Sequence, residues 1–414
     1  MRAVGLITEY NPFHNGHLHH LRESLCNTDA EVSVAVMSGH FLQRGEPALL
    51  DKWTRAEMAL VAGVDVVIEL PLPWACSSAP DFSRGAVQSL AALGVDSLCF
   101  GSESGKIESL QRCADLLYEN ETIVAEKTAK LLRRGVSYPL ARGKILSALS
   151  PDTLESRIFT EPNNILGIEY LKALRLCDSM IQAVTIPRIG AGYHDTDSGA
   201  DGIASATGIR QKLVESESVS DLIPPTVLPI LHQAIAHGRV FAENKYFQLL
   251  LGQIFHNSAD SSDLWLVENG IENRLLNAAE NAFSLEELLS GLKSRQLTRT
   301  RIQRMLASLL LGMKRNLVLQ LFADGPQYLH LLATSAQGQK FLASRRKQRS
   351  IPLIQNFSRI YAILKRHYGV ETSAYRLALQ QLNLELKGTK IYTLLLQNYA
   401  VGNRNRDFFE SLRT

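Results

Sequence analysis

Four histidines, His14, His17, His19 and His20, fall within seven positions near the start of the chain. Histidine can bind a metal ion, donate hydrogen bonds to a phosphate, or lie on a surface without a chemical role. A metal site needs further ligands, and although His14 and His17 have the i, i+3 spacing of one helix face, no cysteine or aspartate accompanies them. We therefore expect no metal here, and residue type alone places His19 and His20 on the surface.

The first pair, His14 and His17, stands where a strand is expected to end and a helix to begin. An apolar strand at residues 3–7 is followed by Pro12, which stiffens a turn, and by Gly16, which lets a ligand approach the backbone. Free N–H groups and the helix dipole at such a start attract phosphate. Two imidazoles could also donate hydrogen bonds to charge developing on a phosphoryl group. We therefore predict a polyphosphate site at this turn.

A second polar motif, SATGIR, covers residues 205–210. Ser205 and Thr207 offer hydroxyl donors, and Arg210 offers a forked cation that suits phosphate oxygens. The simpler interpretation is an ordinary helix capped by Ser205. Taken alone the motif favours the capped helix, but together with the histidine pair it favours a phosphate site.

The elements that must position these residues alternate between strand and helix in the first half of the chain. Short apolar strands are expected at residues 3–7, 32–37, 64–71, 96–103 and 180–188, and helices at 17–26, 51–62 and 83–93. This alternation predicts an α/β fold with a parallel sheet that is covered on both faces. Ligands of such sheets bind beyond the carboxyl ends of the strands. The turns at residues 8–17, 38–46, 101–105 and 188–197 should therefore converge on one crevice.

The second half shows mostly helical periodicity and little strand signal. The Pro-rich segment DLIPPTVLP, residues 221–229, marks a candidate boundary. We predict a catalytic domain at residues 1–225 and a mainly α-helical domain at 226–414, which suits a chain of 414 residues.

Composition excludes several classes of protein. No apolar run reaches the roughly 18 residues of a membrane span, so a membrane partner is not expected. The five cysteines form no CxxC pair, which argues against zinc and disulfide frameworks. The first residues lead directly into a strand without the pattern of a signal peptide, so we expect a cytoplasmic protein.

The net charge of +3 hides an uneven distribution. Between residues 288 and 370 the one acidic residue is Asp324, against fifteen basic residues. Such a stretch is typical of a face that binds a polyanion such as nucleic acid. The candidates in its densest parts are Lys293, Arg295, Arg299, Arg301, Arg345, Arg346, Lys347 and Arg349.

The motifs carry a resemblance. HNGH at residues 14–17 resembles the HxGH motif of the nucleotidyltransferase superfamily, and SATGIR resembles its late S-S-T-x-x-R signature. The segments GLITEYNPFHNGH, MSGHFLQRGEPALLDKWTRAEMAL, VDVVIELP, LGVDSLCFGSESG, EPNNILGIEYLKAL and SATGIR together resemble the bacterial tRNA(Met) cytidine acetate ligase family. The chain departs from the wider superfamily at Thr8 and Asn11, where many members have Gly and Asp, and at Gly208, where many have Lys.

This resemblance implies a Rossmann-like nucleotidyltransferase domain and a two-step reaction. Acetate attacks the α-phosphate of ATP to give acetyl-adenylate and diphosphate, and the acetyl group then passes to N4 of the wobble cytidine of elongator tRNA(Met). The polyanion of the basic stretch would be that tRNA. The basic residues named above are accordingly the predicted tRNA-binding residues.

The resemblance also implies site residues. His14, His17 and Arg210 would be catalytic. The predicted ATP-binding residues are Ile7, Thr8, Glu9, Tyr10, Asn11, Pro12, Phe13, His14, Asn15, Gly16, His17, His20, Gly101, Asn163, Asn164, Arg188, Ser205 and Thr207. The loop SGHFLQRGEP at residues 38–47 is either an active-site loop that accepts acetate or closes over ATP, or an ordinary surface loop.

Two other functions remain open from the sequence: a small-molecule nucleotidyltransferase, and a non-catalytic RNA-binding protein. The basic stretch argues against the first and the complete motifs argue against the second. The sequence does not decide which of Asn163 and Asn164 contacts ATP, which group is the general base, whether magnesium is required, or the oligomeric state.

Overall fold

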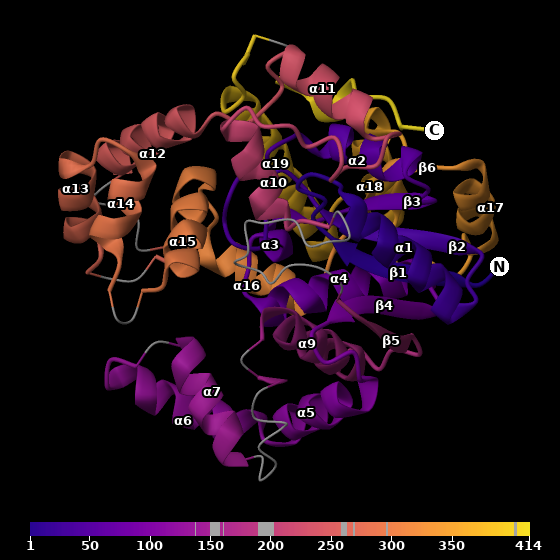
Figure 1. Ribbon diagram of the computed structural model, residues 1–414, viewed down its shortest axis with the longest axis horizontal. Helices are drawn as coiled ribbons and strands as arrows, with labels where there is room; N and C mark the ends of the chain where they lie inside the picture. The colour runs from indigo at the N-terminus through magenta and orange to yellow at the C-terminus, as the bar shows by residue number, and fades with distance from the viewer. Residues whose placement is uncertain are drawn as a thin grey trace.

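The structure is a computed structural model, and it describes residues 1–136, 138–149, 158–159, 161–188, 203–257, 263–267, 270–294, 297–400 and 404–414. A seven-stranded sheet with the order β5-β4-β1-β2-β3-β6-β7 forms its centre, and helices cover both faces (Figure 1). The strands are β1 (Ala3–Thr8), β2 (Val32–Ser38), β3 (Val66–Leu70), β4 (Ser97–Ser102), β5 (Gln182–Pro187), β6 (Leu329–Thr334) and β7 (Leu353–Ile354). The predicted α/β class with a largely parallel sheet is confirmed.

The helices between β1 and β5 follow the predicted alternation. They are α1 (Asn15–Thr28), α2 (Lys52–Val61), α3 (Leu72–Ala75), α4 (Ala79–Leu93), α5 (Ile107–Glu119), α6 (Glu121–Arg133), α7 (Tyr138–Leu149) and α9 (Pro162–Leu176). Asp51 caps α2 as expected, because its carboxylate accepts the Thr54 N–H over 2.9 Å.

The sheet is buried on both faces because successive strand residues point to opposite sides. In β2, Val34 and Val36 join the core under α4 and α9, whereas Ala35 and Met37 join the core under α1 and α2. β1 pairs in register with β2 along its whole length, from Ala3 opposite Val32 to Thr8 opposite Met37. The strands therefore end together, and their last residues form one polar edge.

The chain after residue 225 differs from the expectation of little strand. β6 pairs antiparallel with β3, and β7 pairs parallel with β6, so the late part of the chain extends the sheet. β7 has two residues, and β6 (LHLLAT) is buried throughout, so its sequence lacks the alternation that marks a strand. The division into domains at residue 225 stays a prediction, and the sheet itself crosses that point.

The other helices are α10 (Ala206–Val214), α11 (Leu228–Ala236), α12 (Glu243–Asn257), α13 (Glu272–Asn281), α14 (Leu285–Leu292), α15 (Arg299–Leu311), α16 (Arg315–Asp324), α17 (Ala336–Ser344), α18 (Ile360–Tyr368) and α19 (Ser373–Leu394), with 3-10 turns at Phe357–Arg359 and Arg406–Phe408. Helices α12 to α15 lie together at one side of the molecule, and α17 lies at the opposite side (Figure 1). In the described part of the chain, every helix is too short or too polar to cross a membrane.

Candidate active site

A cavity of about 330 Å³ opens at the carboxyl ends of the parallel strands. The turn after β1, the loop after β2, the ends of β4 and β5 and the start of α10 surround it, as the predicted crevice requires. Most of the residues predicted for ATP and catalysis line it: Ile7, Thr8, Glu9, Tyr10, Asn11, His14, Gly16, His17, His20, Gly101, Asn163, Arg188, Ser205, Thr207 and Arg210. The structure thus brings these residues together, and their individual roles stay predictions.

His14 and His17 form the first turn of α1. The Nδ1 atom of His14 accepts the Gly16 N–H over 3.1 Å, and Nδ1 of His17 accepts the His14 N–H over 3.2 Å. The two rings stack with their centroids 3.7 Å apart. Because each Nδ1 is an acceptor, the proton of each neutral ring lies on Nε2, which makes Nε2 a hydrogen-bond donor.

Burial keeps these rings neutral. Loss of solvent lowers the pKa of His14 to about 3, with Arg188 and Arg210 adding to the effect. Desolvation, followed by the charge of His14, also holds the pKa of His17 well below its usual value. The pair is therefore a set of preorganised neutral donors at the positive end of a helix, as stabilisation of a phosphoryl group requires.

The SATGIR segment begins α10 on the other side of this turn. The Ser205 hydroxyl accepts the Gly208 N–H over 3.1 Å, so the predicted cap is present. Arg210 donates to the Asn11 carbonyl over 3.0 Å and to the Thr207 hydroxyl over 3.2 Å. The capped-helix interpretation and the phosphate-site interpretation thus describe the same segment, because the helix start faces the cavity.

The ends of β4 and β5 supply another wall, with Gly101 and Arg188. A Cβ on Gly101 would lie 3.3 Å from Cγ of Arg188, so glycine leaves room for this arginine. Arg188 donates to Oδ1 of Asn163 over 3.2 Å. Asn164 is fully buried, and its Oδ1 accepts the Ser104 N–H over 3.1 Å. Asn163 is thus the asparagine that faces the cavity, and Asn164 supports the turn behind it.

Three other predicted ATP residues, Pro12, Phe13 and Asn15, do not line the cavity. Phe13 is fully buried and packs against Tyr10, with ring centroids 4.7 Å apart. Asn15 donates from Nδ2 to the Asp221 carbonyl over 2.8 Å, which ties α1 to the segment after α10. These residues shape the turn from behind.

The loop after β2 forms a wall that the ATP prediction did not include. Leu42, Gln43, Arg44 and Glu46 line the cavity, as does His19, which residue type alone placed on the surface. Hairpin contacts between His40 and Ala48 and between Leu42 and Glu46 shape this loop. The polar sequence between Gly39 and Gly45 was the available signal, and the structure favours the active-site interpretation over that of a surface loop.

Among the described residues, Glu69, His330 and Asp407 come close enough together to hold a metal ion. The Lys52 ammonium, however, lies 2.7 Å from both Glu69 and Asp407. Lys52 and His330 hold the pKa of Glu69 down at about 2, although burial opposes them. The ammonium already balances the carboxylates, and we assign no metal to this group.

The predicted tRNA-binding residues fall into two separate groups. Lys293, Arg299 and Arg301 belong to the α14–α15 region, and α15 contacts the loop after β2 through Arg304, which donates to the Gln43 carbonyl over 2.7 Å. Arg345, Arg346, Lys347 and Arg349 follow α17, where Arg345 pairs with Asp96 over 3.1 Å beside the start of β4. The second group therefore lies at the amino ends of the strands, whereas the cavity lies at their carboxyl ends. Helix α17 itself is on the side of the molecule opposite α12 to α15 (Figure 1). Arg295 lies outside the described residues.

Comparison with known proteins agrees with this geometry. Residues 1–407 match the family described as HIGH Nucleotidyl Transferase. The chain belongs to this nucleotidyl transferase family. A relative named tRNA(Met) cytidine acetate ligase, from Syntrophotalea carbinolica, is 54% identical over 99% of this chain and 98% of its own. One of the same name from Lysinibacillus sphaericus is 40% identical over 92% of this chain and 96% of its own.

Solved structures of the family have the same fold. The crystal structure of Thermotoga maritima TmcAL bound with alpha-thio ATP matches with a TM-score of 0.90 and 33% identity, and each chain is covered completely. Its apo form matches with a TM-score of 0.92 and 34% identity, again over both whole chains. The family resemblance and the nucleotidyltransferase fold predicted from the sequence are therefore confirmed.

Proposed function

We propose that this protein is an ATP-dependent acetate–tRNA ligase of the cytoplasm, which forms N4-acetylcytidine at the wobble position of elongator tRNA(Met). The observation that carries the proposal is the pair of neutral histidines, His14 and His17, at the start of a helix that faces a cavity beside Arg210. Relatives that share the whole chain carry the name of this activity.

In the first step an acetate oxygen attacks the α-phosphorus of ATP, and the bond to the bridging oxygen breaks to release diphosphate. Both reactants are anions, so catalysis consists of positioning and of neutralising charge. The Nε2 protons of His14 and His17 would stabilise the α-phosphoryl oxygens, and Arg210 with Thr207 would hold the departing diphosphate. No covalent nucleophile of the protein is needed.

In the second step the acetyl group passes to the exocyclic amine of cytosine. That amine is a poor nucleophile because its lone pair is delocalised into the ring, and a mixed anhydride is reactive enough to acylate it. The base has to leave its stack to enter the cavity, at a cost of about a few kcal/mol in a loop. Of the two basic groups, the first includes α15, which contacts the cavity-lining residues Gln43 and Glu46 through Arg304 and Gln303. We therefore propose that the tRNA approaches from the side of this group.

The test measures both half-reactions with purified protein. Acetate-dependent exchange of labelled diphosphate into ATP reports the adenylate, and ATP-dependent transfer of labelled acetate into bulk bacterial tRNA reports the ligase. We expect both signals, and a magnesium titration of the exchange measures the metal requirement. Exchange without labelled tRNA would indicate a small-molecule nucleotidyltransferase, and tRNA binding without either signal would indicate a non-catalytic RNA-binding protein.

A further inference from the structure

The cavity has two different halves. The order of the strands places β4 and β5 on one side of β1, and β2 on the other. Gly101, Asn163 and Arg188, all predicted for ATP, lie on the β4–β5 side. The β2 side is formed by the loop that contains residues 42–46 and by Glu9, which follows β1 and was also among the residues predicted for ATP. It is also the side that borders α15, from which the tRNA is proposed to approach.

Glu9 is held firmly on this second half. Its Oε1 atom accepts the Gln43 N–H over 2.8 Å, and its own carbonyl accepts a hydrogen bond from the Arg55 guanidinium over 2.6 Å. Arg55 is fully buried and also donates to the carbonyls of Ser38 and Leu50, each over 3.0 Å. The side chain of Glu9 lines the cavity, and among the described residues no donor lies within hydrogen-bond distance of its second oxygen, Oε2.

The other side chains of the cavity that could accept a proton are His14, His17, His19, His20 and Glu46. The Nδ1 atoms of His14 and His17 accept backbone N–H groups, so these rings present donors. Glu46 is the second carboxylate among the described residues that line the cavity, and its Oε1 accepts the Gln303 amide over 2.7 Å. His19 and His20 belong to α1, which packs against β4 and β5, and His20 lies against Cys99 of β4, so both are on the nucleotide half.

We infer that Glu9 is the proton acceptor of the acetyl-transfer step; the inference rests on the proposed function. The amine nitrogen N4 of the cytosine forms a bond to the acetyl carbonyl carbon of acetyl-adenylate. The bond from that carbon to the phosphate oxygen breaks, and AMP leaves with the electron pair. The nitrogen loses one proton, which passes to Oε2 of Glu9. No oxidant, metal or further reactant is required by this step.

The surroundings of Glu9 make its carboxylate a stronger base than that of an exposed glutamate. Burial raises its pKa, while the Gln43 N–H and the charges of Arg55 and Arg210 act against burial, and Glu46 adds to it. The groups that face Glu9 from the elements around it are Arg55, Arg210, Arg304, Glu46, Tyr170 and Cys76. A general base contributes roughly 10²- to 10⁴-fold to a rate.

The test compares the wild type with Glu9→Gln, whose amide oxygen can still accept the Gln43 N–H but cannot take up the proton. Both half-reactions are measured between pH 5.5 and 8.5, with preformed acetyl-adenylate for the transfer step. In the wild type we expect the transfer rate to rise with pH and to level off once Glu9 is ionised. In Glu9→Gln, transfer should fall at least about 100-fold further than diphosphate exchange, and the rise with pH should vanish. Glu46→Gln should keep that rise.

Three outcomes would overturn the inference. Equal losses in both half-reactions would make Glu9 part of the ATP or acetate site. A need for more Mg²⁺ in the exchange reaction of Glu9→Gln, with transfer restored by that Mg²⁺, would make Glu9 a metal ligand. Transfer by Glu9→Gln with the wild-type pH profile would exclude it as the base. A wild-type protein without either half-reaction would instead refute the proposed function.

Discussion

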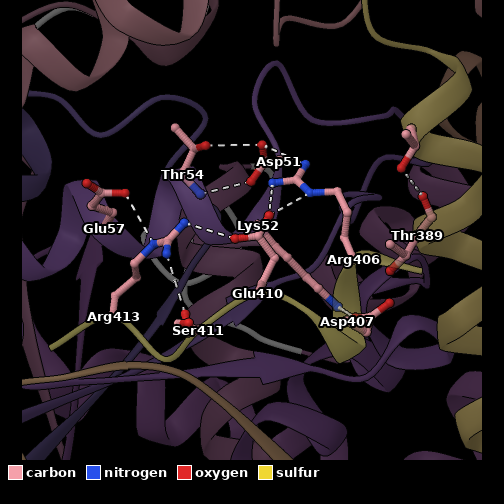
Figure 2. Close-up of polar contacts among 11 residues, drawn as sticks. Asp51, Lys52, Thr54, Glu57, Thr389, Arg406, Asp407, Glu410, Ser411 and Arg413 are labelled. Atoms are coloured by element: carbon pink, nitrogen blue, oxygen red, sulfur yellow. Dashed lines mark hydrogen bonds and ion pairs between the residues drawn. The ribbon is translucent and has the colours of Figure 1, made fainter. Parts of the chain in front are cut away.

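Arg406 donates a hydrogen bond over 3.1 Å to the carboxylate of Asp51, 355 residues earlier in the chain. Both side chains are buried, and the Asp51 side chain is not exposed at all. Asp51 caps α2, and the next residue, Lys52, pairs with Asp407 over 2.7 Å (Figure 2). Arg406 and Asp407 thus hold the start of α2, the helix whose Arg55 binds the backbone carbonyl of Glu9. We call the two ion pairs, Arg406–Asp51 and Lys52–Asp407, the clasp.

Removal of one partner from this clasp should be costly. Arg406→Ala leaves the buried Asp51 carboxylate without its cation, and we expect the free energy of unfolding to fall by about 3–5 kcal/mol. Lys314→Ala is the control, because Lys314 pairs with Asp263 on the surface, away from this network, and its loss should cost about 1 kcal/mol or less. Urea unfolding followed by circular dichroism measures both variants. An equal loss of unfolding free energy in the two variants would show that the clasp stabilises the fold no more than the surface ion pair does.

Gly16 gives the His14 ring its space. A Cβ at this position would lie 2.9 Å from Cε1 of His14, so Gly16→Ala must displace the ring. We expect diphosphate exchange to fall at least about 10-fold, because misplaced groups lose catalytic advantage steeply, while the protein stays folded. Gly252→Ala in α12 is the control, since nothing lies within 4 Å of its added Cβ. An unchanged rate of diphosphate exchange in Gly16→Ala would mean that the reaction does not depend on the observed position of the His14 ring.

The loop after β2 depends on Gly45. Its φ of +86° favours glycine, and an added Cβ would lie 2.3 Å from the backbone nitrogen of Arg304. Gly45→Ala should therefore lift the loop from α15 and weaken acetyl transfer, with a loss of roughly 1–3 kcal/mol in stability. Transfer assays and thermal unfolding measure the two effects. A wild-type rate of acetyl transfer in Gly45→Ala would show that the loop does not contribute to the second step.

Stability should fall in acid well above pH 4. Burial lowers the pKa of His14 to about 3 and of His20 to about 4, and it lowers the pKa of His17 and His40 as well. Below about pH 6.5 the unfolded chain binds protons that the folded chain does not, so the free energy of unfolding decreases as the pH falls, by up to about 1.4 kcal/mol per histidine and pH unit.

Buried carboxyl groups whose pKa is raised, Glu9 and Glu385, act in the opposite direction. Burial raises the pKa of Glu385 to about 8, so its folded form holds a proton that the unfolded form releases above about pH 4.5. Urea unfolding between pH 5 and 7.5 gives the net slope, and Glu385→Gln should make it steeper by about one proton. A flat profile in both proteins would contradict the neutral histidines.

Charge reversal distinguishes the two basic groups. We expect Lys293→Glu with Arg301→Glu to weaken tRNA binding and to reduce the salt slope of log K by about two, because both residues belong to the α14–α15 region, whose Arg304 contacts the loop after β2. Arg346→Glu with Lys347→Glu, at the amino ends of the strands, should have a smaller effect. The reverse ranking, measured by filter binding at several salt concentrations, would place the tRNA across the other edge of the sheet.

Local pattern was enough to predict the backbone arrangement at the centre of the site. The strand, Pro12 turn and helix around His14 and His17 were predictable because each depends on neighbours in sequence, as were the caps at Asp51 and Ser205. The same holds for the parallel sheet, because its strands up to β5 can be recognised in the sequence as short apolar runs between helices.

Tertiary structure alone decided what depends on contacts between distant residues. Asn163 and Asn164 are adjacent and chemically identical, and the turn of α9 against residues 103–104 determines which one faces the cavity. The basic stretch is continuous in sequence, but β6 runs antiparallel to β3, so α17 begins at the amino ends of the parallel strands. The surroundings of Glu9 come from four segments: the loop after β2, α2, α10 and α15. Burial and long-range hydrogen bonds bring these segments together only in the folded protein. No sequence period encodes such contacts, so the sequence could not predict them.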